Sequence, residues 1–295
     1  MKVALCGKGE QPLDKQIEKV LFGEEMTKDE KIFERLRADY EKVAEKYTVL
    51  GVFLQGSQNY GLDYEGSDID TKAIIIPSLE DIVLNRKPVS TTWILESNEH
   101  IDVKDIRLMH ECFRKQNINF VEILFTKYRI LNPEYEDLYQ PMFGCREYIA
   151  HYNKVAAVKC ILGQIMEKRK ALCHPYPTII DRIEKYGYDP KQLHHIFRNY
   201  DFLLRYTNGY TYEECLDSPS KSWLIDVKRL PPLYSLDEAV RAADDTVNAA
   251  KDAEKKYLSY LEQINYAPDK SAEALMSDVL CEVIKKALKL ELVDF

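Results

Sequence analysis

One segment constrains the fold of this chain more than any other: residues 51–76, GVFLQGSQNYGLDYEGSDIDTKAIII. Its first apolar run stops at Gly56-Ser57, and a second apolar run follows directly after Asp68 and Asp70. Short apolar runs bounded by glycine and polar residues are typical of buried strands. The segment therefore predicts a strand, a glycine-containing turn, and a second strand with two carboxylates at its start.

The two acids Asp68 and Asp70 are separated by a single apolar residue. Because successive side chains of a strand point to opposite faces, Ile69 would pack inward while both carboxylates point to one spot. Carboxylates held that close repel each other unless a cation neutralises the pair. Hard oxygen ligands favour Mg²⁺ or Mn²⁺ over zinc, so the spacing predicts a divalent-cation site.

The turn at Gly56 and Ser57 offers complementary chemistry. Glycine lets the backbone approach a phosphate closely, and serine adds a hydroxyl donor. Backbone amides at a turn that opens a helix attract anions. A nucleoside triphosphate (NTP) needs donors for its terminal phosphates and a metal near the reacting phosphorus. We therefore expect Gly56 and Ser57 to bind the triphosphate, beside the two acids.

The order of these features resembles the DNA polymerase β-type nucleotidyltransferase superfamily: a strand, Gly-Ser, a Tyr-Gly-Leu segment, then Ser-Asp-Ile-Asp entering a strand that ends at Pro77. More narrowly, GSQNYGLDYEGSDIDTKAIIIP is similar to the predicted nucleotidyltransferases of the RNA-repair-associated branch. The resemblance implies an α+β fold with a mixed sheet and flanking helices. It also implies an enzyme that transfers a nucleoside monophosphate from an NTP to a hydroxyl acceptor and releases pyrophosphate.

That superfamily needs a third carboxylate on a neighbouring strand. In HIDVKD, residues 100–105, Asp102 stands between two apolar residues and is the candidate. The resemblance then implies that Asp68, Asp70 and Asp102 hold two Mg²⁺ or Mn²⁺ ions, with Asp102 on the ion that activates the acceptor hydroxyl. The alternative is that Asp102 or Asp105 only caps the helix expected to start near residue 105.

Three glutamates compete with Asp102 for this role, namely Glu96, Glu99 and Glu122. Glu122, in NFVEILF, stands where members of the superfamily tend to carry a glutamate. We expect it to fix a helix against the sheet rather than to contact metal.

A second motif lies far downstream, within YGYDPKQLHHIFRNYDFLLRYTNG. Asp189-Pro190 is a typical helix start, and Lys191, His195 and Arg198 then share one helical face. Such a face suits a polyphosphate, although a basic stripe is also typical of the solvated side of an amphipathic helix. The stripe resembles the Lys-x-x-x-His-x-x-Arg helix of the same branch, which favours nucleotide binding by these three residues.

The pattern of apolar residues divides the chain near residue 143. Before this point strands and helices alternate, and beyond it almost every segment has helical periodicity. Pro141 and Gly144, in LYQPMFGCREY, mark the boundary. We predict a catalytic domain with an N-terminal helical arm over residues 1–143 and an all-α domain over residues 144–295.

Composition restricts the partners and the compartment. A formal net charge of −8 argues against a protein whose whole surface binds nucleic acid. Seven cysteines without a Cys-x-x-Cys pair indicate a reducing compartment and no zinc site. No apolar run has the length of a membrane helix. We therefore expect a cytoplasmic protein that has no membrane partner.

The acceptor stays open at this level, since an RNA 3′ end, a protein hydroxyl and a small molecule all fit the superfamily. An alternative of a different class is a non-catalytic or regulatory, antitoxin-like partner that keeps the nucleotidyltransferase fold and binds another protein. The three acids and the intact Gly56-Ser57 turn favour the enzyme.

Overall fold

The computed structural model of this chain describes residues 26–293. Residues 1–25 of the expected N-terminal arm lie outside this range. The elements in the first half are α2 (Lys28–Ala44), β1 (Thr48–Leu54), the three-ten helix η1 (Gly56–Tyr60), β2 (Thr71–Ile76), α3 (Leu79–Val83), β3 (Ser90–Ile94), β4 (His100–Asp105), η2 (Ile106–Leu108), α4 (Met109–Arg114), α5 (Ile118–Val121), η3 (Glu122–Leu124), β5 (Arg129–Leu131) and α6 (Glu136–Gly144). The second half contains α7 (Arg146–His151), α8 (Lys154–Ala171), α9 (Ile180–Tyr186), α10 (Pro190–Thr207), α11 (Tyr212–Leu216), α12 (Lys221–Lys228), α13 (Leu236–Gln263) and α14 (Lys270–Val293).

The strands form one mixed sheet in the order β3-β4-β2-β1-β5. Only the β2–β4 pair is parallel among the strands of residues 26–293. Strands β1 and β5 approach closely at Gly51, where an added Cβ would lie 2.9 Å from the Ile130 carbonyl oxygen. This position therefore requires glycine. The observed sheet confirms the expected α+β fold with a mixed sheet and flanking helices.

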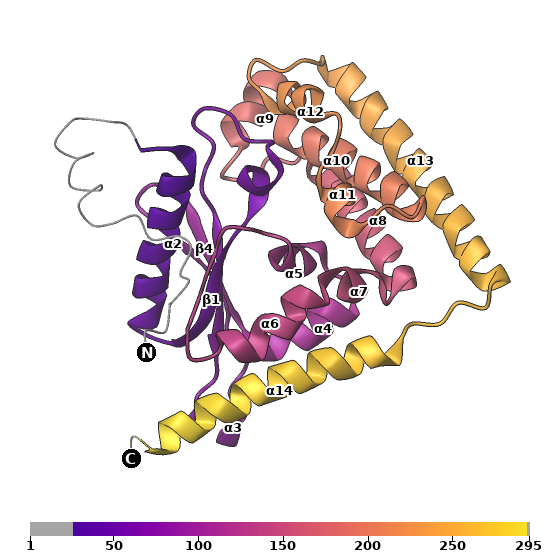
Figure 1. Cartoon of the computed structure of the whole chain (residues 1–295). Coiled ribbons are helices and arrows are strands. Elements are labelled where there is room, and N and C mark those ends of the chain that lie inside the picture. The colour runs from indigo at the N-terminus through magenta and orange to yellow at the C-terminus, as the bar shows by residue number, and fades with distance from the viewer. Residues whose placement is uncertain (1–25, 294–295) are drawn as a thin grey trace, which may run out of the picture.

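The two faces of the sheet are covered differently (Figure 1). On one face, α2 packs Ile32, Leu36 and Val43 against alternate residues of β1 and β2. On the other face a larger hydrophobic cluster begins at Phe53 and Ile74 and continues into the helices up to α14. Sheet and helical region therefore share one core.

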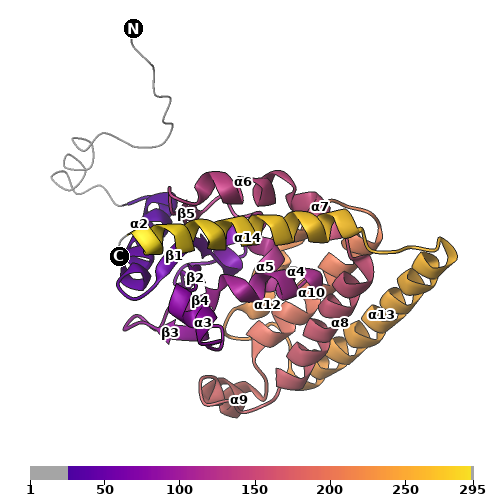
Figure 2. The ribbon, with the colours of Figure 1, turned by 90° about the horizontal axis from the view of Figure 1, so that it is seen from below.

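The second half of the chain is helical, as predicted. Helix α10 packs against α8, α12 and α13, and α13 forms the outer edge of the molecule (Figure 1). Helix α14 then returns to the first half and packs along α6 and α4 (Figure 2). Near its end the Glu291 carboxylate accepts a hydrogen bond from the Leu79 N–H at 2.8 Å. The predicted boundary at residue 143 falls at the end of α6 and stays a prediction.

Local structure differs from the expectation around this boundary. Pro141 lies inside helix α6, although an internal proline costs a helix about 3 kcal/mol. Burial of Tyr139, Met142 and Phe143 in the shared core offsets that cost. Further on, residues 146–172 have one continuous helical periodicity, which predicts a single helix. The structure instead contains α7 and α8, and the Asn153 side chain caps α8.

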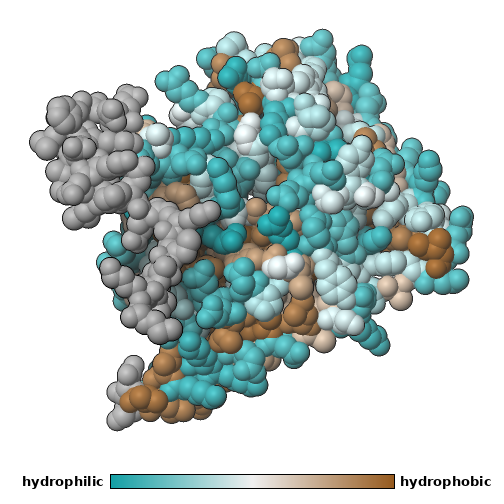
Figure 3. Space-filling model, in the orientation of Figure 1, coloured by the Kyte–Doolittle hydropathy of each residue, from teal (hydrophilic) through white to brown (hydrophobic). Residues whose placement is uncertain are grey.

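The face of the molecule seen in Figure 3 is mostly hydrophilic, and hydrophobic residues gather toward its lower edge, where α6 and α14 lie. Across residues 26–293, none of the helices combines the length and the apolar character needed to cross a membrane.

Candidate functional site

The pairing of β1 with β2 brings the glycine turn next to the acidic segment. Where the two strands end, the Gln55 N–H donates a hydrogen bond to the Asp70 carbonyl at 2.8 Å. Gly56 follows with a φ of +76°, a backbone conformation that favours glycine. It opens η1, which also contains Ser57. The turn expected to bind phosphate and the acids expected to bind metal are therefore neighbours.

The acidic segment precedes β2 and is held by the start of β4. The Ile69 N–H donates to Glu99 Oε1 at 2.9 Å, and the His100 N–H donates to Asp70 Oδ1 at 3.0 Å. Ile69 packs against the cluster on the α2 side. Residues 68–70 precede β2 and do not lie in a strand, so the alternation expected to point both carboxylates to one spot does not apply to them. Asp68 is exposed and has no hydrogen bond or ion pair with the described residues. It is therefore accessible to a ligand.

Asp102 lies within β4, opposite Lys72 in the parallel pairing with β2. Lys72 Nζ donates to Asp102 Oδ2, and Lys104 Nζ forms an ion pair with Oδ1, both at 2.8 Å. The Thr92 hydroxyl also donates to Oδ1, at 3.2 Å. Both oxygens of the third predicted acid are therefore bound by protein donors.

The alternative roles of nearby acids are visible in the fold. Asp105 caps η2 by accepting a hydrogen bond from the Arg107 N–H at 2.9 Å, so Asp102 is not the helix cap. Glu122 is buried and accepts a hydrogen bond from the Tyr60 hydroxyl. It thereby ties η3 to η1, whereas the sequence predicts that it fixes a helix against the sheet.

The Asp102 carboxylate is charged at neutral pH. Burial by itself would raise its pKa, but the ammonium groups of Lys72 and Lys104 outweigh burial and lower it. Lys72 is only 1% exposed and lies 4.4 Å from the centre of the Phe120 ring. Within residues 26–293 its one ion pair is with Asp102, so each of the two compensates the charge of the other.

The resemblance implies two divalent cations, which would need free carboxylate oxygens on Asp68, Asp70 and Asp102. Asp68 and the Oδ2 of Asp70 leave oxygen ligands for one hard cation. Asp102 offers no oxygen that is not already bound to lysine. No group of three His, Cys, Asp or Glu side chains in the described part of the chain is placed to hold a metal. Asp68 and Asp70 therefore keep carboxylate oxygens available for one cation, whereas Asp102 keeps none for a second.

Helix α10 brings its predicted basic face to η1. Asp189 caps the helix by accepting the Lys191 N–H at 3.1 Å, and Pro190 is its first residue, as predicted. Further along, the Arg198 guanidinium lies 4.0 Å from the centre of the Tyr60 ring. The helical region therefore contacts the short helix that begins at the glycine turn.

The two adjacent histidines of α10 are neutral at pH 7. His194 is buried with its Nδ1 2.7 Å from the Leu224 carbonyl oxygen, and burial lowers its pKa to about 3. Burial, together with His194 and Arg198, also lowers the pKa of His195 well below its ordinary value. His195 therefore contributes no positive charge, and a contact between His195 and a nucleotide would be a hydrogen bond.

Helix α12 adds cations that the sequence interpretation missed. The pKa of Lys228 is lowered to about 8, first by burial and then by the nearby positive charges of Lys191, Arg198 and Arg229, while the Asp63 carboxylate opposes the shift. Lys228 Nζ lies 5.0 Å from the centre of the Tyr64 ring, in the segment between the glycine turn and the acids. We refer to Lys191, Arg198 and Lys228 as the cation cluster. None of the three forms an ion pair within the part of the chain that the structure describes.

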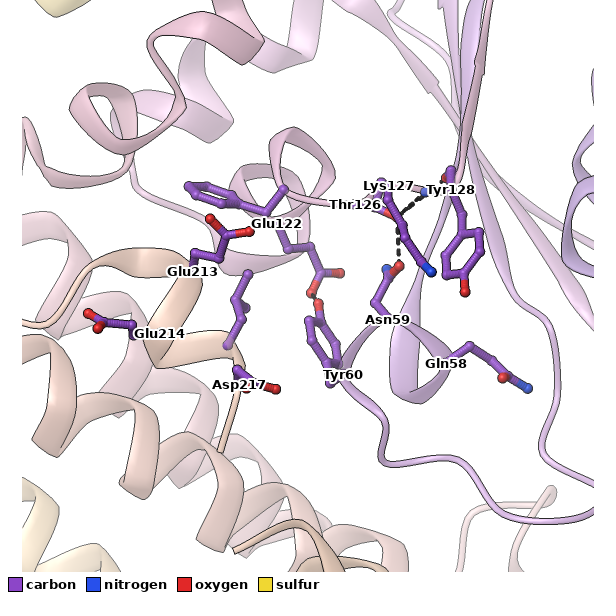
Figure 4. A pocket seen from close by; sticks show the side chains of 12 residues that line it. Gln58, Asn59, Tyr60, Glu122, Thr126, Lys127, Tyr128, Glu213, Glu214 and Asp217 are labelled. Atoms are coloured by element: carbon purple, nitrogen blue, oxygen red, sulfur yellow. Dashed lines mark hydrogen bonds between the residues drawn. The ribbon is translucent and has the colours of Figure 1, made fainter. Parts of the chain in front are cut away.

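A separate cavity of about 540 Å³ opens beside η1 (Figure 4). In Figure 4 the Tyr60 hydroxyl points toward Glu122, and the Thr126 hydroxyl bonds to Asn59 at 2.6 Å. The lining also includes Glu213, Glu214 and Asp217. None of the eight predicted site residues lines this cavity, to which η1 contributes Gln58, Asn59 and Tyr60.

The chain was compared with known proteins. No protein-family model matches this chain, and no curated protein matches it. Among solved structures it is similar to the crystal structure of a nucleotidyltransferase-like protein from Exiguobacterium sibiricum 255-15. The identity is 12%, the alignment covers 86% of this chain and 88% of that chain, and the TM-score is 0.33. That description does not extend to an RNA-repair branch.

Proposed function

We propose that this protein is a metal-dependent nucleotidyltransferase, which transfers a nucleoside monophosphate from an NTP to a hydroxyl acceptor and releases pyrophosphate. One observation carries the proposal. Arg198 of the cation cluster lies on Tyr60 of η1, and η1 begins at the turn that pairs with Asp70. This arrangement supports the proposal, because an NTP and its metal require phosphate donors and metal-binding acids in one site.

In this proposal the triphosphate lies between the glycine turn and the cation cluster. Gly56 and Ser57 would supply backbone and hydroxyl donors, and the cluster would neutralise the outer phosphates. His195 would act as a neutral hydrogen-bonding group. The residues proposed to bind the nucleotide are Gly56, Ser57, Lys191, His195, Arg198 and Lys228.

Asp68 and Asp70 would hold Mg²⁺ or Mn²⁺, and Asp102 would be the third catalytic acid, on the acceptor side. When bound, a divalent cation supplies charge neutralisation at the reacting phosphate and a lower pKa for the attacking hydroxyl. The acceptor oxygen forms a bond to the α-phosphorus as the bond to the leaving pyrophosphate breaks. One proton is released from the acceptor, and no oxidation or reduction occurs.

Nucleotidyl transfer can be measured directly. The full chain is incubated with each α-³²P-labelled NTP, Mg²⁺ or Mn²⁺, and a mixture of RNA, protein and small hydroxyl compounds. We expect label transfer by the wild type and by Asp278→Ala, an exposed acid of α14, and none by Asp68→Ala or Asp70→Ala. Unchanged transfer by both acid variants, with folding confirmed by circular dichroism, would exclude the proposal.

The same experiment identifies the acceptor class. The net charge of −8 favours a protein or a small molecule over long RNA, whereas the RNA-repair branch would act on an RNA end. Label on RNA, with binding that weakens steeply as salt rises, would identify RNA, because counterion release scales with the number of phosphate contacts. Label on protein or on a small molecule would identify the other classes.

One feature of the site also supports a second candidate function. The two lysines on Asp102 neutralise an acid that the resemblance assigns to catalysis. A non-catalytic, antitoxin-like partner that keeps this fold would not need that acid free. The observation expected for this candidate is stable co-purification with a defined second protein, retained in the double variant Asp68→Ala/Asp70→Ala. It also requires that no transfer and no metal-dependent NTP binding are found.

A further inference from the structure

Building on the proposed function, we infer that the site takes a single divalent cation, on Asp68 and Asp70, and that the Lys72 ammonium group stands in for a second cation at Asp102. Lys72 is part of β2, two residues beyond Asp70, and lies opposite Asp102 in the register of the sheet. The strand pairing itself therefore delivers a positive charge to the third acid.

Burial and neighbouring side chains confine the Lys72 ammonium group to this position. Its side chain is 1% exposed, whereas the Asp102 side chain is 20% exposed. The ammonium group is 2.8 Å from Asp102 Oδ2 and packs over the Phe120 ring of α5. Within residues 26–293 there is no second carboxylate on Lys72. A cation that displaced it would leave a buried lysine without a partner, which is strongly unfavourable.

Lys104 provides a natural comparison, because it binds the other oxygen of the same carboxylate. Its side chain is 15% exposed, and its Nζ also donates to the Ser90 hydroxyl at 2.9 Å. Lys104 therefore has both solvent and a second partner if it leaves Asp102. The two lysines neutralise the same acid, but only Lys72 is confined to it.

Lys72 is thus a positioning residue: it acts through Asp102 and does not itself touch the nucleotide. Coulomb attraction for a second divalent cation is weak at an acid that already has a buried ammonium group 2.8 Å away. Within residues 26–293 no lysine is paired with Asp68 or Asp70, and the side-chain contacts of Asp70 are with the backbone N–H and ring of His100.

Manganese binding to the full chain tests the inference without reference to turnover. Protein is mixed with Mn²⁺ and either α,β-methylene-ATP or tripolyphosphate, and tripolyphosphate removes any dependence on the base. Protein-bound Mn²⁺ is counted by electron paramagnetic resonance, in which two ions about 3.5–4 Å apart show spin coupling. We expect one uncoupled Mn²⁺ per wild-type chain.

Three variants test whether the charge of Lys72, rather than that of Lys104, excludes the second ion. Lys72→Met keeps the apolar stem and removes the charge, so it should bind a second, coupled Mn²⁺. Lys72→Arg and Lys104→Met should both stay at one ion, and thermal unfolding confirms that each variant is folded. If Lys72→Met does not fold, Lys72→Gln replaces it in the comparison.

The possible results separate the two proposals. Two coupled ions in the wild type, or a single ion in a folded Lys72→Met or Lys72→Gln variant, overturn the inference and leave the proposed function standing. Absence of bound Mn²⁺ with both probes overturns the proposed function and with it this inference. One ion that is lost in Asp68→Ala/Asp70→Ala, together with two ions in Lys72→Met, supports both.

Discussion

Individual residues of the site differ in how strongly the fold depends on them. Asp68 is exposed and free of partners among the described residues, whereas Asp102 neutralises the buried Lys72. Breaking a buried ion pair on one side leaves the other charge uncompensated. Two acids with the same expected chemical role should therefore behave differently in stability measurements.

Asp102→Ala should lower the free energy of unfolding by about 3 kcal/mol, the low end of the range for a broken buried pair, because Asp102 is 20% exposed. Asp68→Ala should change it by less than about 0.5 kcal/mol. Urea denaturation of the two variants and the wild type measures both values. Equal losses for the two variants would show that Lys72 finds another partner or solvent.

The affinity for an NTP or tripolyphosphate should fall as the pH rises through about 8. Lys228 is charged below its pKa of about 8 and neutral above it, and a phosphate binds the charged form better. Isothermal titration from pH 7 to 9 measures the change. In Lys228→Met this component of the pH dependence should disappear, while Lys255→Met, at an exposed lysine of α13, should retain it.

The free energy of unfolding should change with pH in the opposite direction to the affinity. The pKa of Lys228 in the folded state lies below its ordinary value of 10.5, so the unfolded state binds more protons between about pH 8 and 10.5. The contribution of this group to stability therefore rises across that window.

For the affinity prediction, a wild type whose affinity for an NTP or tripolyphosphate is constant from pH 7 to 9 would exclude Lys228 from the phosphate site.

Among the elements, η1 connects the sheet to the helices. Its last residue, Tyr60, donates a hydrogen bond to Glu122 of η3 and supports Arg198 of α10 on its ring. Burial and the Glu122 carboxylate raise the pKa of the Tyr60 phenol well above its ordinary value, so it stays a donor at all physiological pH values. Tyr60 thereby links the short helix that begins at the glycine turn to both η3 and α10.

Tyr60→Phe should lower the free energy of unfolding by about 1–3 kcal/mol, because it leaves the Glu122 carboxylate buried without its donor. Tyr64→Phe, at a tyrosine that is 40% exposed, is the matched control and should be close to neutral. Replacing both partners, as Tyr60→Phe/Glu122→Met, should recover part of the loss. Thermal or urea unfolding of these variants and of the single variant Glu122→Met measures this, and losses that are fully additive in the double variant would contradict the coupling.

At the scale of the whole molecule, one hydrophobic core joins the two halves that were predicted to divide at residue 143. The hydrophobic cluster extends from Phe53 of β1 to Val283 of α14. Helix α14 ends against the first half, where Glu291 binds the Leu79 N–H. Because the two halves share this core, we expect them to unfold as one unit.

The two tryptophans report on the two regions separately, because Trp93 lies in β3 and Trp223 in α12. In the single-tryptophan variants Trp223→Phe and Trp93→Phe, fluorescence should therefore show transitions that agree with the far-ultraviolet circular dichroism of the same variant. A tryptophan signal that changes at a clearly different urea concentration from the circular dichroism would instead support independent domains over residues 1–143 and 144–295.

Local patterns were sufficient for several elements. The helix over 190–207 begins where Asp189 and Pro190 predict it, and the strands on either side of the glycine turn lie within one residue of the apolar runs. Helix α12 has a weaker local signal, since in KSWLIDVKR only Leu224 and Val227 are buried, three residues apart. Such a short helix depends on packing against α10, which periodicity alone does not reveal.

The sequence by itself determined the motif: two apolar strands, the glycine turn and the acids, since strand periodicity and glycine conformation are local properties. It also determined the basic face of α10. Only the tertiary structure decided what surrounds these residues. The register of β2 on β4 sets Lys72 against Asp102, and the packing of α10 sets Arg198 on Tyr60. Both are contacts between residues distant in the chain, so their electrostatics depend on how the elements pack.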